Sequence, residues 1–135
     1  MMPGPFHSLH ISGSGMNVYQ TWIDAVADNV ANINNVTATD EPAFRERLVV
    51  ARAREGSRPN GAVVDCLELG DANGELVYQP DHPLADNEGM VRLPSVDLSQ
   101  QMTHMLVAQR AYQANVSAFR SARDAYQRAL QIGSR

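Results

Sequence analysis

The residues with the most chemical potential lie in a short acidic loop. Asp81, His82, Asp86 and Glu88 fall within eight residues, and carboxylates beside an imidazole can ligate a divalent cation. Their spacing matches no defined cation-binding loop, and Asp residues in segments rich in Pro and Gly usually bond to their own backbone. The loop is therefore interpreted as a turn, with a small enzyme that uses these side chains as an alternative.

The N-terminal segment offers a second set of reactive side chains. It combines serines with histidines, namely Ser8, Ser12, Ser14, His7 and His10. A nucleophile also needs an oriented base and an oxyanion pocket on a rigid scaffold, which a terminal segment cannot be assumed to supply. Gly13-Ser14-Gly15 lacks the lysine and the preceding strand of a phosphate-binding loop, so it is interpreted as a flexible joint. We expect no catalytic residue, no metal and no cofactor.

Composition narrows the class of protein further. The chain has 135 residues, with 11 arginines, no lysine and 15 acidic residues, so its net charge is −4. The length allows one ordinary domain, and the acidic balance excludes a dedicated nucleic-acid-binding module. No apolar run approaches the ~20 residues of a membrane span. The single cysteine, Cys66, can form no internal disulfide and is predicted to be a small buried residue in a strand.

A heptad stripe predicts a first helix over residues 12–36, following an irregular segment at residues 1–11. Ser12 or Ser14 is a plausible N-cap, an Asn-rich run after Asn32 is a stop signal, and Trp22 is a packing anchor. The stripe repeats at steps of three and four residues. It consists of Met16, Tyr19, Ile23, Val26, Val30 and Ile33.

The same period predicts a second, longer helix within residues 95–135. Pro94 with Ser95 or Asp97 marks its start and Gly133 its end, and its length of ~55 Å exceeds what a compact domain needs. Its stripe consists of Leu98, Met102, Met105, Gln109, Tyr112, Val116, Phe119, Arg123, Tyr126 and Leu130. The polar members Gln109 and Arg123 are interpreted as residues that fix register or reach solvent, and His104 as a solvated helix residue.

Residues 37–94 change to short β-rich runs separated by turn residues. Runs at residues 48–51, 62–69 and 76–78 are separated by Pro59-Asn60-Gly61 and Asn73-Gly74, which predicts a hairpin or a three-stranded meander. So few residues bury too little apolar surface to be stable alone. We therefore predict a mainly α protein with a small β part that leans on the helices or on a partner.

Charge adds a reason for the two helices to pair. Residues 95–135 carry a net charge of +3 and residues 12–34 a net charge of −2. Two long terminal helices with heptad stripes and opposite charge fit a coiled-coil-like pair, within one chain or between chains. A monomeric two-helix layer on a β-meander is the alternative that periodicity leaves open.

The N-terminus shows no sign of a secretory signal. No arginine precedes Arg45, and residues 1–14 contain no apolar core of signal-peptide length. These features alone predict a cytoplasmic protein, although export systems that leave the N-terminus uncleaved would produce the same pattern.

Three strings resemble the rod and hook family of flagellar axial proteins. Asn29-Val30-Ala31-Asn32, followed by Thr37 and Pro42-Ala43-Phe44-Arg45, resembles the family's N-terminal signature with a longer insertion. Arg110-Ala111-Tyr112-Gln113-Ala114-Asn115 resembles its C-terminal helix signature. A central loop with the pattern Tyr-x-Pro-x-His-Pro-Leu-Ala-Asp is similar to that of proximal rod proteins, and its characteristic residues are Tyr78, Pro80, His82, Pro83, Leu84, Asp86 and Gly89.

The resemblance implies a structural, non-enzymatic role. Terminal helices of this family pair and stack with those of neighbouring subunits into a tube, and the middle segment lies outside. It implies as partners copies of the chain itself, other rod proteins, the membrane-ring and export-gate adaptor at the rod base, and the distal rod. It also implies passage through the flagellar type III export apparatus without cleavage and a periplasmic location in the basal body, with no nucleic acid and no membrane insertion.

Assembly residues follow from the stripes and the resemblance together. Asn29, Asn32, Gln113 and Asn115 are candidates for capping or for hydrogen bonds between subunits. The stripe residues expected at the interface are Met16, Tyr19, Ile23, Val26, Val30, Ile33, Met102, Met105, Gln109, Tyr112, Val116, Phe119, Arg123 and Tyr126. The alternatives are another axial protein of the same family and a cytoplasmic coiled-coil adaptor.

Overall fold

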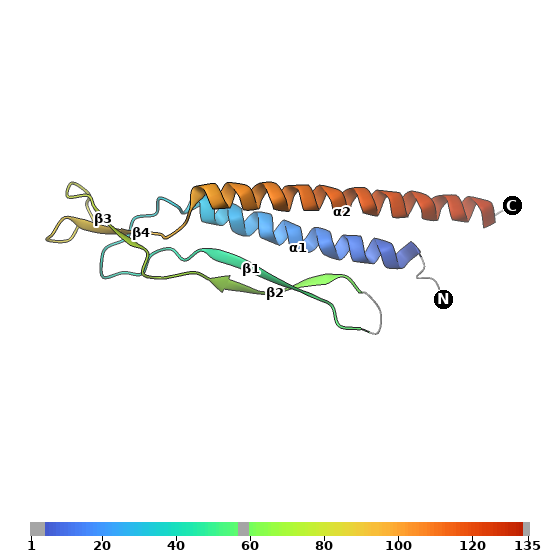
Figure 1. Ribbon diagram of the computed structural model, residues 1–135, viewed down its shortest axis with the longest axis horizontal. Coiled ribbons are helices and arrows are strands. Elements are labelled where there is room, and N and C mark those ends of the chain that lie inside the picture. Colours follow the sequence, from blue (N-terminus) through green and yellow to red (C-terminus); the bar gives the residue numbers. More distant parts are fainter. Residues whose placement is uncertain (1–4, 57–59, 134–135) are drawn as a thin grey trace.

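The molecule is elongated, with two long helices side by side and two small hairpins. A computed structural model describes residues 5–56 and 60–133. In Figure 1, α1 (Pro5–Ala31) and α2 (Leu98–Gly133) run antiparallel, so that the start of α1 and the end of α2 lie towards the same end of the molecule. Strands β1 (Arg47–Ala53) and β2 (Ala62–Leu69) lie along α1, whereas β3 (Glu75–Tyr78) and β4 (Met90–Leu93) lie beyond the other end of the helices.

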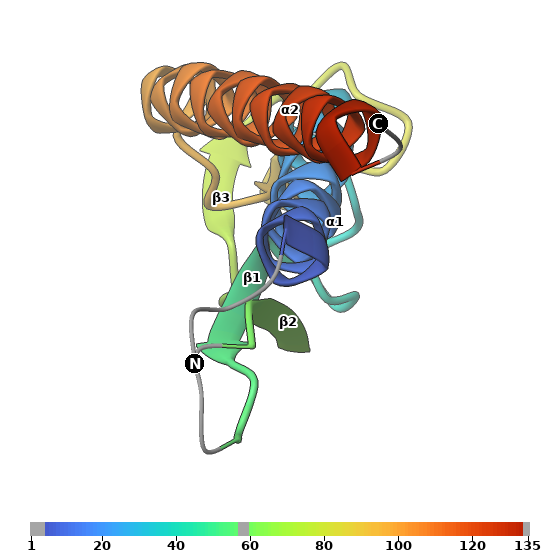
Figure 2. The ribbon, with the colours of Figure 1, turned by 90° about the vertical axis from the view of Figure 1, so that its right-hand side faces the viewer.

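Seen along the helices, these elements form layers. Figure 2 shows α2 against one side of α1 and the β1–β2 hairpin against the opposite side. Helix α1 is therefore the central layer, and it holds half of the buried apolar side chains among the described residues. The buried apolar side chains are Val18, Ala25, Val26, Ala43, Val91 and Ala108.

Helix α1 starts earlier than the sequence predicts. It begins at Pro5, so the expectation of an irregular segment is wrong for residues 5–11, and residues 1–4 lie outside the described residues. Proline is well suited to the first turn of a helix because no N–H is required there. Ser12 and Ser14 are consequently buried inside the helix and are not N-caps. The helix ends at Ala31, directly before the Asn-rich run predicted as its stop signal and short of the predicted bound at residue 36. The backbone N–H and the side-chain Nδ2 of Asn32 both donate to Asp28 O.

Helix α2 confirms the prediction of a long C-terminal helix. It spans 36 residues, or about 54 Å at 1.5 Å per residue. Asp97 is its N-cap, since Asp97 Oδ1 accepts a hydrogen bond of 2.8 Å from the N–H of Gln100. Its last turns extend past the start of α1 (Figure 1).

Aromatic and small residues join the two helices. Near one end the rings of Phe6 and Tyr126 lie 4.6 Å apart, and further along those of Trp22 and His104 lie 5.8 Å apart. The latter contact supports Trp22 as a packing residue and shows that His104 is not simply solvated. Between these contacts, a Cβ at Gly15 would lie 2.5 Å from Asn115 Oδ1, so the helices approach closely at this glycine.

The ion pairs among the described residues do not link the two helices. The ion pairs among the described residues are Arg47–Asp28, Arg52–Asp65 and Arg123–Asp124. None of them joins α1 to α2, because the acidic residue of α1 that forms an ion pair contacts β1 instead.

The β part consists of two separate hairpins and not a three-stranded meander. Strands β1 and β2 pair antiparallel with a register shift between Val50 and Ala51. Strand β3 pairs with β4, a strand that the sequence reading missed, and an isolated bridge joins Thr37 to Arg92 of β4.

Cys66 is exposed on β2, so the prediction of a buried thiol is wrong. This half of the hairpin has no helix covering it. In the described part of the chain, no helix is long and apolar enough to cross a membrane.

Candidate assembly surface

A buried cluster of polar side chains joins α1, α2 and the start of β1. Asn29 and Gln101 are 1% and 0% exposed. Asn29 Nδ2 donates to Gln101 Oε1 at 3.0 Å and to Arg47 O at 3.0 Å, while Asn29 Oδ1 accepts from the N–H of Arg47 at 2.8 Å. Gln101 Nε2 donates to Glu46 Oε1 at 2.6 Å. The Asn29 amide thus bonds to both backbone groups of Arg47, as a paired strand residue would.

This cluster changes the interpretation of the candidates on α1. Asn29 was a candidate for capping or for bonds between subunits, yet both N–H groups of its amide are used within the chain and the residue is buried. Val26 is also buried within the chain and leaves no surface for a neighbour. The other predicted seam residues of α1 are half-buried between α2, the hairpin and solvent, and they are Met16, Tyr19, Ile23, Val30, Asn32 and Ile33. Sequence reasoning missed Gln101, because a glutamine in a helix carries no signal that distinguishes a buried position from an exposed one.

The stripe predicted on α2 does not face α1 directly. The fully buried residues of α2 are Gln101 and Ala108, and Asn115 meets Gly15 on the same side. The predicted stripe is rotated from this line by roughly a quarter-turn, given 3.6 residues per turn. Its exposed members are Leu98, Met102, Gln109, Arg123 and Leu130, with Gln113 exposed beside them, whereas Met105, Tyr112, Val116, Phe119 and Tyr126 are half-buried along its edge.

An apolar surface on α2 is left without cover as a result. Met102 is 42% exposed and Leu106 is 57% exposed, and Leu98 lies one turn before Met102. Further along α2, a hollow of about 350 Å³ is lined by Tyr112, Gln113, Val116, Ser117 and Arg120. We call the surface formed by Leu98, Met102, Leu106 and this hollow the open face of α2. Large apolar groups gathered on one side of a helix normally pack against another protein surface.

The loop between β3 and β4 is ordered by its own backbone. Asp86 Oδ1 accepts from the N–H groups of Glu88 and Met90, both at 2.9 Å, and Asp86 Oδ2 accepts from Thr39 Oγ1 at 3.1 Å. The N–H of Met90 makes the largest contribution to a lowered pKa of Asp86. Desolvation opposes it, and the N–H of Glu88, the Thr39 hydroxyl and the N–H of Gly89 lower the pKa further. The carboxylate therefore serves the turn, and the described residues contain no group of three side chains suited to a metal ion.

The remaining family residues complete the same turn. Gly89 has a φ of +77°, and a Cβ there would lie 2.8 Å from the Tyr78 ring and 3.1 Å from Pro80. His82 Nδ1 accepts from the N–H of Leu84 at 3.2 Å, so this imidazole closes the turn beside Pro83. Tyr78 and Leu84 are left exposed on its outside. The segment is an ordered turn, one of the two forms that the sequence allows.

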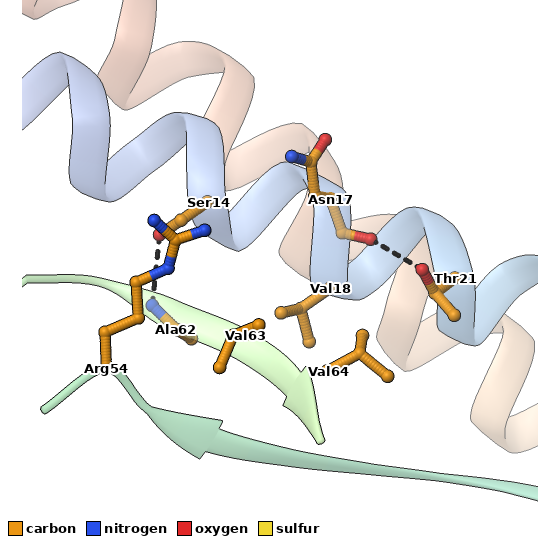
Figure 3. Close-up of a pocket in the computed structure, with 8 residues that line it drawn as sticks. All are labelled: Ser14, Asn17, Val18, Thr21, Arg54, Ala62, Val63 and Val64. Carbon is orange, nitrogen blue, oxygen red and sulfur yellow. Dashed lines mark hydrogen bonds between the residues drawn. The ribbon is translucent and has the colours of Figure 1, made fainter. Parts of the chain in front are cut away.

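The groove between α1 and the β1–β2 hairpin, drawn in Figure 3, is a structural joint. It has a volume of about 210 Å³ and is lined by Ser14, Asn17, Val18, Thr21, Arg54, Ala62, Val63 and Val64. Ser14 Oγ donates to Ile11 O at 2.7 Å and accepts from the N–H of Ala62 at 3.0 Å. A Cβ at Gly61 would collide with this hydroxyl. Gly13-Ser14-Gly15 is therefore a rigid attachment point for the hairpin, and its interpretation as a flexible joint is wrong.

These features define a class of protein. Two of the chain's exposed surfaces are an apolar helix face on α2 and an ordered loop between β3 and β4. A long terminal helix pair with one uncovered apolar face is typical of a structural subunit that assembles through its helices.

Comparisons with known proteins specify the family. A family model described as "Flagellar basal body rod FlgEFG protein C-terminal" matches residues 87–132. The flagellar basal-body rod protein FlgC of Yersinia enterocolitica is 34% identical over 91% of this chain and 93% of its own length. FlgC of Aquifex aeolicus is 32% identical over 93% and 95%, and FlgC of Bacillus subtilis 29% identical over 95% and 97%. The chain belongs to the FlgC family of flagellar basal-body rod proteins, which are structural proteins and not enzymes.

Proposed function

We propose that the chain is a subunit of the proximal rod, which polymerises through its terminal helices into the periplasmic drive shaft that carries torque from the motor to the hook. The observation that carries this proposal is the open face of α2, with Met102 and Leu106 exposed in a row of large apolar side chains. Membership of the rod family supports the same role. A neighbouring subunit that covers this face removes apolar surface from water, which stabilises the contact by about 25 cal/mol per Å².

The helix pair explains how such a subunit can be rigid once assembled. Within the chain, α1 and α2 are already joined at Phe6–Tyr126, Gly15–Asn115 and Asn29–Gln101. A neighbour therefore meets a preformed surface, and little conformational entropy has to be lost on contact. Shared coiled-coil-like seams around a tube would then resist twisting, because each helix is held on more than one side.

The modest core supports export in an unfolded state. The buried apolar side chains among the described residues are all alanines and valines, so the isolated chain gains little free energy from burial. We propose that it passes unfolded through the flagellar type III export apparatus, without cleavage, and folds once exported. Its partners would be copies of itself, other rod proteins, the membrane-ring and export-gate adaptor at the rod base, and the distal rod.

The first test is the composition of purified hook and basal-body particles. Mass spectrometry of washed, detergent-extracted particles should find the intact chain in fixed proportion to known rod components, including peptides near Met1. Absence from the particles, with the chain found in the cytoplasm while flagella are being built, would overturn the proposal and favour the adaptor alternative.

A pair of substitutions tests the open face itself. Met102→Asp should abolish incorporation into the particles, since it places an unpaired carboxylate in an apolar contact. Thr103→Asp adds the same charge at the next residue, away from this face, and should assemble normally. Equal incorporation of the two variants would show that polymerisation uses another surface.

A further inference from the structure

The loop between β3 and β4 presents apolar side chains on a rigid support. Tyr78 is 67% exposed and Leu84 is 45% exposed, although the turn that carries them is fixed by the bonds of Asp86 and by the close approach of Gly89 to Tyr78. Exposed apolar groups on a preorganised loop are a common basis for recognition, because ordering them on contact costs little.

Two acidic side chains of this loop have no partner among the described residues. The carboxylates of Asp81 and Glu88 make no hydrogen bond or ion pair with any other residue in 5–56 or 60–133, and both residues are exposed. They belong to a segment of net negative charge, since residues 37–94 carry six arginines and eleven acidic residues. The apolar tip of the loop is thus bordered by unpaired negative charge.

The hollow on α2 has the complementary properties. Its walls are formed by Tyr112 and Val116, with Gln113 and Ser117 beside them, and its volume of about 350 Å³ lies in the range of sites that bury a small group. Arg120 lines it and has no acidic partner in the described part of the chain. The helix segment around it carries net positive charge, with five arginines against two aspartates in residues 95–135.

The loop and the hollow of one chain cannot meet. Figure 1 places the β3–β4 loop beyond one end of the helix pair, whereas the second half of α2 extends towards the other end. The hollow of a chain is therefore open to another molecule, and if that molecule is a second copy, the contact joins two different patches of identical chains and is heterologous.

We propose that the β3–β4 loop of one copy docks into the α2 hollow of the next copy, in a head-to-tail contact. Leu84 and Tyr78 contact Tyr112 and Val116, and Asp81 and Glu88 face Arg120. Repetition of this contact adds copies in one direction without closing, as a filament requires. This inference rests on the proposed function, because it assigns a partner and an orientation to the open face of α2.

Disulfide cross-linking in intact particles tests the contact. In a Cys66→Ser background, Leu84→Cys is combined with Ser117→Cys, two exposed positions on the loop and in the hollow. Particles oxidised with diamide should give a ladder of dimers, trimers and higher species on non-reducing gels. Each single-cysteine variant should give none, because a heterologous contact never brings two copies of one position together.

A charge exchange provides a second, independent readout. Arg120→Glu should lower the yield of the ladder about fivefold, the change expected from loss of one or two solvent-exposed ion pairs. Adding Glu88→Arg to that variant should restore it.

The outcomes separate this inference from the proposed function. A chain present in the particles without a ladder, or cross-linked only to a different rod protein, overturns head-to-tail docking between copies and leaves the rod assignment intact. Dimers from Leu84→Cys alone overturn it too, since they indicate a symmetric contact. A wild-type chain absent from the particles overturns the proposed function, and this inference with it.

Discussion

The two sides of α2 differ in what they bury. The side that packs on α1 uses small and polar residues, with Ala108 and Gln101 fully buried and Asn115 against Gly15. The open face, roughly a quarter-turn away, carries larger apolar residues, of which Leu98, Met102 and Leu106 are exposed. The chain thus closes on itself through close approach and hydrogen bonds, and it leaves its strongest source of apolar burial for contacts with other molecules.

The largest effect is expected from a charge in the hollow of the open face. Val116→Asp should reduce incorporation into basal bodies by about 100-fold or more, because a carboxylate would replace an apolar wall of the hollow and would be buried against a neighbour. Ala114→Asp, on an exposed position of the same helix away from the hollow, should incorporate normally. Quantitative mass spectrometry of particles, with circular dichroism to compare helix content, measures both. The comparison between the two sides breaks if both variants assemble equally well.

The next effect concerns the side of α2 that packs on α1. It should appear in the free energy of unfolding and not in contacts with other molecules. Asn29→Ala should lower the free energy of unfolding by about 2–3 kcal/mol, because it leaves Gln101 Oε1 and both backbone groups of Arg47 without this partner. Denaturant titration of the purified chain measures it. Gln20→Ala removes an exposed hydrogen bond to Asp24 in the same helix and should change stability by less than about 0.5 kcal/mol. Similar losses in both variants would refute the role of the buried cluster.

A smaller effect tests how closely the helices approach. Gly13→Ala should stabilise the chain by about 1 kcal/mol through helix propensity, since nothing lies within 4 Å of a Cβ there. Gly15→Ala should lose this gain and be less stable than Gly13→Ala by about 1–2 kcal/mol, because its Cβ meets the Asn115 amide. Addition of Asn115→Ala should recover the difference. Thermal unfolding of the variants gives the answer, and identical gains at the two glycines would show that the helices do not touch here.

The smallest effect is expected in the loop and depends on pH. The pKa of Asp86 in the folded chain lies below the ordinary value of 3.8 for this carboxyl group, because backbone N–H groups, Met90 first, bond to it. Its ionised form therefore stabilises the folded state above about pH 4, and this contribution is lost as the pH falls through the lower folded pKa. Wild type should lose more thermal stability between pH 5 and pH 2 than Asp86→Asn does. Asp81→Asn, which removes an exposed carboxylate of the same loop, should follow wild type; a parallel decline in all three proteins would exclude this role of Asp86.

Periodicity predicted both helices but not the direction in which α2 faces. The repeat of large apolar residues identifies one side of α2, and it predicts that α1 packs on that side. The actual contact side is defined by Gln101, Ala108 and Asn115, whose types are equally common on surfaces. Only the three-dimensional match to Gly15 and Asn29 makes them interior residues.

Local turn and capping residues correctly predicted the β3–β4 loop but led to a wrong prediction for the start of α1. Pro, Asp and Gly between residues 80 and 89 specify an ordered turn by local bonds, which the structure contains. Ser12 and Ser14 look like N-caps for the same local reasons, but α1 continues through them because they are covered by other elements. Strand β4 was missed in the sequence, and its pairing with β3 defines it.

The β1–β2 hairpin is attached to α1 at two separate points, which limits how it can move relative to the helix. Ser14 holds Ala62 at one point and Asn29 holds Arg47 at the other, about 22 Å apart along the helix. Ala62 is paired with Ala53, so the same two points are separated along β1 by about 20 Å. A single attachment would let the hairpin rotate about that point, whereas two attachments at matched spacing transfer a sideways force on the hairpin directly to α1. A hairpin held in this way turns together with the helix that carries it.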